Sequence, residues 1–345
     1  MYSFLLQVES KSGLKTNLLR SRIYFQPLAR RNLMDTRISR RNLLRAAAAS
    51  AIPLKAVGNP VAGTFALDEE PANSASGNDR ILDMHVHFDE KNPNFIPDLV
   101  TLAERMNLTA CLLTPYPHRA EVADAAKKYP QHIVPFGFIE LDAPDVLAQV
   151  KDFHALGYRG LGELEFVKKP YTDPSYVPVY ELANQYGWIL FFHTGIVLRR
   201  TVDQPEDVAS YRMRAFHLEE IARRFPKLTV IGAHCGNPEY EWAAEVARWN
   251  PNVFFDLSGS TLTKMSARLG EFKNIFWWSG QGEWKTETPA NDPSAFVKLV
   301  FGSDSGLEGI PRVLEQYRAL FKACDVPVST QKMILGGTLA SILRL

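Results

Sequence analysis

The sequence predicts an α/β protein whose folded part is a (β/α)8 barrel of the TIM type. From residue 81 onward, eight short apolar runs alternate with longer segments that have helical spacing. The stretch 80–345 is also close to the roughly 250 residues of one such barrel. Strands that alternate with helices form a parallel sheet with right-handed crossovers, and eight repeats favour closure of that sheet into a barrel.

Each predicted element follows from this alternation. The apolar runs predict strands at 81–88, 109–114, 133–139, 158–164, 188–193, 228–234, 253–257 and 298–304. The segments between them predict helices at 96–106, 119–128, 145–156, 177–186, 209–224, 240–249 and 311–323. Pro311 stands in the first turn of the last helix, where its missing N–H is tolerated. The stretch 260–297 is rich in Trp, Gly and Pro and is predicted as an elaborated loop.

The charge of the chain is unevenly distributed. Residues 1–66 carry eleven Lys/Arg against two acids, a net charge of +9, whereas residues 67–345 carry 28 against 36, a net charge of −8. This predicts a basic leader over 1–66, a polar linker over 67–79 and a single barrel domain over 80–345. The acidic body argues against a general nucleic-acid binder, because contacts to phosphates need Lys and Arg. No run of 18 apolar residues is present, which excludes an ordinary membrane span.

The leader contains paired arginines, Arg40 and Arg41, followed by the alanine-rich run 46–51. This order resembles a bacterial twin-arginine export signal, and the small residues near Ala66 suit a cleavage site. We therefore expect the twin-arginine export machinery to be a partner and the protein to be periplasmic or extracellular. A basic amphipathic helix is the alternative. Translation from Met34 instead of Met1 would give a more compact signal.

The first predicted strand carries two histidines, His85 and His87, on alternate positions with Asp83. Alternate side chains of a regular strand share a face, so we expect these three residues inside the barrel. Two imidazoles on neighbouring inward positions can hold one metal ion. The apolar residues between them are expected to face the helix layer: Leu82, Met84 and Val86.

Four further strands end in a polar residue that follows an apolar run: Glu163, His193, His234 and Asp304. Glu163 and His193 are 30 residues apart, and His193 and His234 are 41 apart, each about one βα unit. The carboxyl ends of the strands of a barrel converge on one mouth, where catalytic groups lie. The sequence therefore predicts that these residues are neighbours in space.

Taken together, these motifs resemble the amidohydrolase superfamily, and most closely its amidohydrolase-2 branch. The segments that carry the resemblance are Asp83-Met84-His85-Val86-His87, His193-Thr194-Gly195, Ala233-His234-Cys235-Gly236 and Gly302-Ser303-Asp304. The tail 334–343 also resembles the ending of that branch, with Thr338 where the family usually has asparagine. The resemblance covers roughly 80–345 and implies a metal-dependent hydrolase barrel.

The resemblance implies that His85, His87, His193 and Asp304 bind a divalent metal, for which Zn²⁺ is well suited. Such a metal lowers the pKa of bound water to roughly 7 and polarises a carbonyl oxygen, and Asp304 would accept the proton of that water. His234 is either a ligand to a second metal or a proton shuttle and oxyanion partner. Glu163 is either a metal ligand or supporting acid, or the partner in a local salt bridge, so one or two ions stay open.

Three functions follow from this set. The first is a metal-dependent hydrolase that acts on a C–N or C–O bond of a small molecule. The second is a metal-dependent decarboxylase or lyase that acts on a small carboxylate with the same residues. The third is a non-catalytic ligand-binding barrel, against which the complete set of site residues argues. Arg199 is a candidate to clamp a substrate carboxylate, with a solvated loop as the alternative. The substrate is open, and so is a homo-oligomeric state.

Overall fold

The computed structural model describes residues 80–197, 209–278 and 293–345. The predicted leader, its twin-arginine motif and the polar linker lie outside the described residues, and so does Arg199. None of the described helices is long and apolar enough to cross a membrane.

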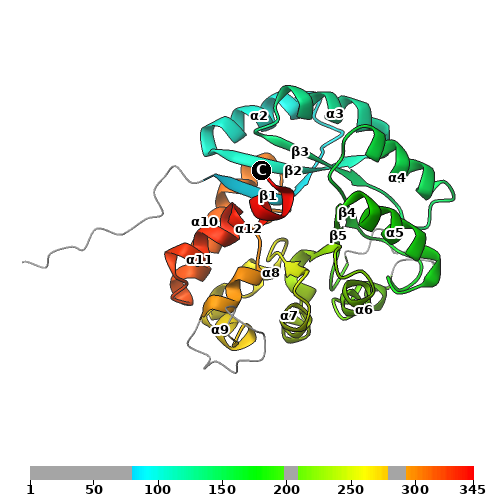
Figure 1. The fold of residues 1–345 in the computed structure, drawn as a ribbon. Coiled ribbons are helices and arrows are strands. Elements are labelled where there is room, and N and C mark those ends of the chain that lie inside the picture. Colours follow the sequence, from blue (N-terminus) through cyan, green and yellow to red (C-terminus); the bar gives the residue numbers. More distant parts are fainter. Residues whose placement is uncertain (1–79, 198–208, 279–292) are drawn as a thin grey trace, which may run out of the picture. The chain divides into compact units, whose positions relative to one another are not determined.

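Seven parallel strands form one sheet, in which each strand pairs with the next along the chain. They are β1 (Ile81–His87), β2 (Leu108–Pro115), β3 (Ile133–Phe138), β4 (Gly160–Leu164), β5 (Ile189–Phe192), β6 (Thr229–Gly232) and β7 (Val253–Phe255). The helices lie around the outside of this curled sheet (Figure 1). The predicted α/β barrel fold is therefore confirmed.

The eighth position of the barrel is filled by an extended segment that is not a regular strand. Val300 N donates to Phe255 O of β7 at 2.9 Å, and Met84 N of β1 donates to Phe301 O at 2.9 Å. The segment thus lies between β7 and β1 and closes the barrel. The prediction of a regular strand over 298–304 was wrong.

A buried carboxylate explains why this segment is irregular. Asp83 Oδ1 accepts hydrogen bonds from Ser303 N at 2.9 Å and from His85 N at 3.0 Å. A side-chain oxygen therefore satisfies two backbone donors that a regular ladder would pair with carbonyls. Sequence spacing alone does not reveal this substitution.

Strand β1 contains a bulge that changes which side chains face inward. Asp83 pairs with Ala110 and Val86 with Leu112, so Met84 and His85 together stand against one residue of β2. As a result, Leu82 and Met84 pack among the interior side chains of the barrel, and the prediction that they face the helices was wrong. Val86 does pack on the helix side, as predicted.

The main helices cover the outer face of the sheet. They are α2 (Phe95–Met106), α3 (Arg119–Lys128), α4 (Val146–Ala155), α5 (Val177–Tyr186), α6 (His217–Arg224), α7 (Tyr240–Trp249) and α10 (Ile310–Ala323). The helix predicted over 209–224 begins only at His217. The carbonyls of Arg212 and Met213 accept hydrogen bonds from Tyr171 N and Gly195 N, which draws the preceding segment out of the helix.

Short helices occupy two places where none was predicted. Within the described part of the expected loop 260–297, α8 (Thr261–Lys264) and α9 (Phe272–Ile275) lie after β7. At the C-terminus, α11 (Val328–Lys332) and α12 (Thr338–Leu343) follow α10.

Helix α12 lies at the amino-terminal end of the barrel. Its residues Leu339 and Leu343 belong to the interior apolar cluster that also contains Leu82 and Met84. Arg159, directly before β4, donates from Nη2 to Leu343 O at 2.7 Å. The barrel is thus filled by apolar side chains at this end, and its polar residues gather at the other.

Candidate metal centre

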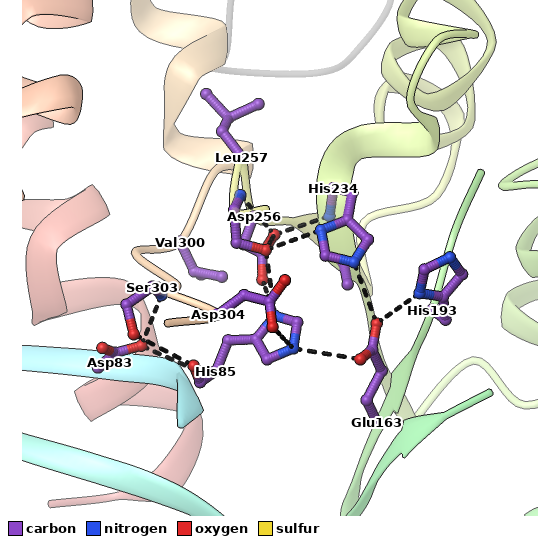
Figure 2. Close-up of polar contacts among 12 residues, drawn as sticks. Asp83, His85, Glu163, His193, His234, Asp256, Leu257, Val300, Ser303 and Asp304 are labelled. Atoms are coloured by element: carbon purple, nitrogen blue, oxygen red, sulfur yellow. Dashed lines mark hydrogen bonds and ion pairs between the residues drawn. The ribbon is translucent and has the colours of Figure 1, made fainter. Parts of the chain in front are cut away.

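Six of the predicted site residues lie together at the carboxyl ends of the strands. Figure 2 labels all of them except His87. They come from five places in the barrel: His85 and His87 from β1, Glu163 from β4, His193 after β5, His234 after β6, and Asp304 from the closing segment. Sequence separations of 30 to more than 200 residues therefore become contacts in space.

Glu163 lies between two groups of histidines. Its Oε2 is 3.2 Å from His85 Nε2 and 3.5 Å from His87 Nε2. Its Oε1 is 2.8 Å from His193 Nδ1 and 3.3 Å from His234 Nε2. Each oxygen of one carboxylate thus faces a different pair of imidazoles. The resemblance placed His193 with His85 and His87, whereas these distances group it with His234.

Asp304 joins the first of these groups. Its Oδ1 lies 3.5 Å from His85 Nε2 and 3.7 Å from His87 Nε2. The side chains of Asp304 and His87 are 30% and 38% exposed, whereas those of the other four residues are at most 10% exposed. Solvent therefore reaches the cluster on the side of His87 and Asp304.

Backbone geometry after β6 presents His234 to the cluster. His234 has a φ of 61°, and the turn is held by Thr194, whose Oγ1 accepts from Gly236 N at 2.9 Å and donates to Ala233 O. Opposite the ring, Gly259 has a φ of +61°, and a Cβ there would lie 2.9 Å from His234 Nδ1. Only glycine leaves room for this ring at no conformational cost.

One residue of the cluster, Asp256, was not predicted from the sequence. Asp256 follows the apolar residues of β7, is fully buried, and holds its Oδ2 3.0 Å from His85 Nδ1. Its Oδ1 accepts from His234 N at 2.7 Å. The signal was the same one that identified Glu163 and Asp304, a polar residue after an apolar run at a strand end.

The electrostatics of the cluster favour positive charge within it. Burial lowers the pKa of His85, but the carboxylates of Asp304 and Glu163 and the hydrogen bond to Asp256 outweigh it and raise the pKa well above its usual range. Burial raises the pKa of Glu163, yet His85, His193 and His234 together lower it well below its usual range. Two buried carboxylates, Glu163 and Asp256, beside the partly exposed Asp304 thus require compensating positive charge.

The donor set fits a divalent metal. Every ion pair of Glu163, Asp256 and Asp304 with a described residue is with a histidine. Ligands about 2.1 Å from a tetrahedral ion lie roughly 3.4 Å from one another. In the first group, the nitrogen–nitrogen and nitrogen–oxygen distances run from 3.1 to 3.7 Å. Imidazole nitrogens and carboxylate oxygens are the ligands that Zn²⁺ prefers among O and N donors.

A cavity of about 720 Å³ adjoins the cluster. Of the six site residues, His87 and Asp304 line it. Its described walls also carry three carboxylates, Asp89, Asp98 and Glu308, and a single guanidinium, Arg105. The cavity is large enough for a small-molecule substrate. It borders the exposed side of the cluster, since His87 and Asp304 line it.

Comparison with known proteins agrees with this architecture. The family model described as "Amidohydrolase" matches residues 114–337. An uncharacterised TIM-barrel protein from Bordetella bronchiseptica superposes with a TM-score of 0.54 at 16% identity, over 77% of this chain and 98% of that one. The 2,6-dihydroxybenzoate decarboxylase from Rhizobium superposes with a TM-score of 0.51 at 13% identity, over 77% and 98%.

A third solved structure is a protein assigned as a 2-pyrone-4,6-dicarboxylic acid hydrolase, from Pseudomonas putida. It superposes with a TM-score of 0.51 at 14% identity, over 77% of this chain and 98% of that one. A search of curated proteins finds no significant match. At these identities the structures support the fold alone. The family model covers well over half of the sequence and includes β4 to β7 and the closing segment, so the chain belongs to the amidohydrolase family.

Proposed function

We propose that this protein is a metal-dependent hydrolase that cleaves a C–N or C–O bond of a small molecule. It would use two divalent cations, and Zn²⁺ is the ion that suits the ligands best. The observation that carries the proposal is Glu163. Its two oxygens face two separate pairs of imidazoles, His85 with His87 and His193 with His234. A carboxylate in this position is suited to bridge two ions.

The positions of the residues suggest which cation each would hold. Asp304, His85 and His87 would hold one cation, and His193 and His234 would hold the other. Glu163 would be a ligand to both. When bound, such cations supply an activated water and polarise a carbonyl oxygen. Asp304 borders the cavity, so its carboxylate is placed to accept a proton from an attacking water.

Of the two roles left open for His234, burial favours that of a ligand. The side chain is 10% exposed, and His234 is not among the residues that line the cavity. A proton shuttle needs to reach the substrate, whereas a ligand needs only its Nε2 lone pair directed at the ion. The 3.3 Å distance from His234 Nε2 to Glu163 Oε1 supports the role of a metal ligand.

The cavity walls favour a hydrolase over a decarboxylase. A carboxylate substrate is best recognised by cationic side chains. In the described walls, three carboxylates beyond the metal cluster (Asp89, Asp98, Glu308) stand against Arg105. The charged side chains of the described wall are thus mainly negative, which would disfavour an anionic substrate. A non-catalytic barrel is disfavoured because it has no need of two complete ligand groups beside an open cavity.

The test is turnover by the metal-loaded protein on activated esters, lactones and amides. We expect hydrolysis that a chelator abolishes and that added Zn²⁺ restores. The same preparation is given aromatic carboxylates, and released CO₂ is measured. Metal-dependent CO₂ release without hydrolysis of any member of the first panel would replace the proposal with the decarboxylase alternative.

We also propose that the protein is exported through the twin-arginine route, on the sequence of its leader alone. The paired guanidinium groups of Arg40 and Arg41 are the feature such machinery reads. Replacing both by Lys should leave the protein in the cytoplasm of a bacterial host, as cell fractionation would show. Unchanged export of the double variant would contradict the proposal.

A further inference from the structure

We propose that Asp256 is a positioning residue that sets the tautomers of His85 and His234, the two histidines on either side of Glu163. One buried carboxylate would thus prepare both halves of the centre for metal. The inference rests on the proposed metal-dependent function and concerns a residue that touches none of the reacting atoms.

The direct half of the argument is the contact with His85. Asp256 is fully buried, and its Oδ2 lies 3.0 Å from His85 Nδ1. An ionised carboxylate only accepts hydrogen bonds, so the proton of a neutral His85 ring must be on Nδ1. The lone pair of Nε2 then points toward Glu163 Oε2, 3.2 Å away. A carboxylate behind an imidazole fixes the orientation of the ring and raises its basicity as a ligand.

The second half passes through Ser258. The hydroxyl of Ser258 lies 2.6 Å from Asp256 Oδ1 and 3.0 Å from His234 Nδ1. Because its single proton is donated to the carboxylate, its oxygen must accept from His234 Nδ1–H. The lone pair of His234 Nε2 is thereby directed at Glu163 Oε1. The Ser258 oxygen also lies 3.1 Å from His85 Nδ1, from which it would accept a hydrogen bond as well.

A glycine on the neighbouring segment leaves space for the carboxylate of Asp256. Gly302, in the segment that closes the barrel, would carry a Cβ 2.4 Å from Asp256 Oδ2. Any larger residue at 302 would push the carboxylate away from His85. The close approach of Gly302 is therefore explained by the position of Asp256, and it supplies a way to displace the carboxylate without changing it.

The first variant is Asp256→Asn. Asp256 Oδ1 accepts from three donors, the backbone nitrogens of His234 and Ser258 and the hydroxyl of Ser258. The asparagine oxygen should remain there, since turning it away would set its NH₂ against those donors. The NH₂ group then faces His85 Nδ1 and forces the ring proton onto Nε2, the nitrogen that would bind metal.

The measurement is the dissociation constant of Zn²⁺ for the purified full chain, from competition with a chromophoric chelator. We expect Asp256→Asn to weaken Zn²⁺ binding about 10–100-fold. Ser258→Ala should weaken the binding of the ion that His193 and His234 would hold, and should leave the binding of the other ion unchanged. In ¹H–¹⁵N spectra of Zn²⁺-loaded protein with labelled histidine, the hydrogen-bonded Nδ1–H of His85 should be present in the wild type and absent from Asp256→Asn.

Two matched controls separate positioning from general damage. Asp83→Asn makes the same change at another fully buried carboxylate, whose Oδ1 accepts from the backbone nitrogens of His85 and Ser303 and whose Oδ2 has no hydrogen-bond partner among the described residues. Gly302→Ala displaces Asp256 chemically intact and should also weaken Zn²⁺ binding. Its control is Gly270→Ala, where the nearest heavy atom to the new Cβ, Ala323 O, is 3.7 Å away.

The outcomes are distinguishable. A wild-type chain that binds no Zn²⁺ overturns the proposed function together with this inference. Wild-type binding that Asp256→Asn leaves within about twofold overturns the positioning role alone. Equal weakening by Asp83→Asn and Asp256→Asn, with the Nδ1–H signal of His85 retained, also overturns it. If Asp256→Asn does not fold, Ser258→Ala and Gly302→Ala decide by the same criteria.

Discussion

The two ends of the barrel interior are made of opposite kinds of side chain, although they share the same strands. At the amino-terminal end, Leu82 and Met84 of β1 belong to one apolar cluster with Leu339 and Leu343 of α12. One residue beyond Met84, His85 is fully buried in a cluster of histidines and carboxylates. The bulge in β1 is what allows this change, because it turns Met84 and His85 to the interior together.

The fold thus places the side chains that stabilise the barrel at one end and the candidate metal ligands at the other. The apolar end gains free energy from burial and close packing. The polar end buries the carboxylates of Glu163 and Asp256, which is unfavourable without positive charge. Changes at the polar end should therefore alter metal content and turnover more than folding, and changes at the apolar end should do the reverse.

The largest effect should come from removing a ligand. In His85→Ala we expect bound metal and turnover to be lost together, because no neighbouring group replaces the imidazole between Glu163 and Asp304. Metal analysis and an activity assay measure the two. The control is His154→Ala, which removes an exposed histidine stacked on Tyr186. Retention of full metal content by His85→Ala would contradict the assignment of the polar end as the metal-binding end.

The next effect separates proton transfer from metal binding. Asp304→Asn keeps one oxygen that can coordinate but cannot accept a proton at neutral pH. Turnover should fall by about 10²–10⁴ while the metal largely remains. Should the variant keep full turnover with its metal bound, another group at the mouth must act as the base, and our assignment of Asp304 would be wrong.

At the apolar end we expect the opposite pattern. Leu339 is fully buried in the interior cluster, and Leu339→Ala should lower the free energy of unfolding by about 2–5 kcal/mol. Metal content per folded chain should not change. Urea unfolding and metal analysis of the same preparation check both statements, and a loss of metal from this variant would show that the two ends are not separable.

The smallest effect concerns pH. Lys298 donates from Nζ to the carbonyls of Asn250, Pro251 and Val253, which precede or begin β7, and burial lowers its pKa from 10.5 to about 8. Between these values the unfolded chain binds more protons, so stability rises with pH across this range. Metal-free wild type should gain more stability from pH about 8 to about 10.5 than Lys298→Met. Equal gains would contradict the lowered pKa.

The sequence was sufficient to predict the fold and most residues of the candidate metal cluster, for a definite physical reason. Parallel strands in a barrel bring their carboxyl ends to one mouth, so a polar residue after an apolar run is informative wherever it occurs. This rule found Glu163, His193, His234 and Asp304. Applied to β7, it also identifies Asp256, which the sequence analysis passed over because no motif surrounds it.

Other features were beyond the reach of sequence patterns. Alternation along β1 reads the same with or without a bulge, so Leu82 and Met84 were assigned to the wrong face. The irregular eighth segment depends on Asp83 accepting from Ser303 across 220 positions. The division of the histidines into two groups depends on how the Glu163 carboxylate is turned. Each of these is a tertiary contact that leaves no periodic trace.

The central claim, that Glu163 joins two metal-binding groups, is tested most directly by counting metal. Purified protein saturated with Zn²⁺ and freed of excess should hold close to two ions per chain, and Glu163→Gln should lose one, because an amide offers one coordinating oxygen instead of two. A single ion in the wild type, unaltered by Glu163→Gln, would contradict the account.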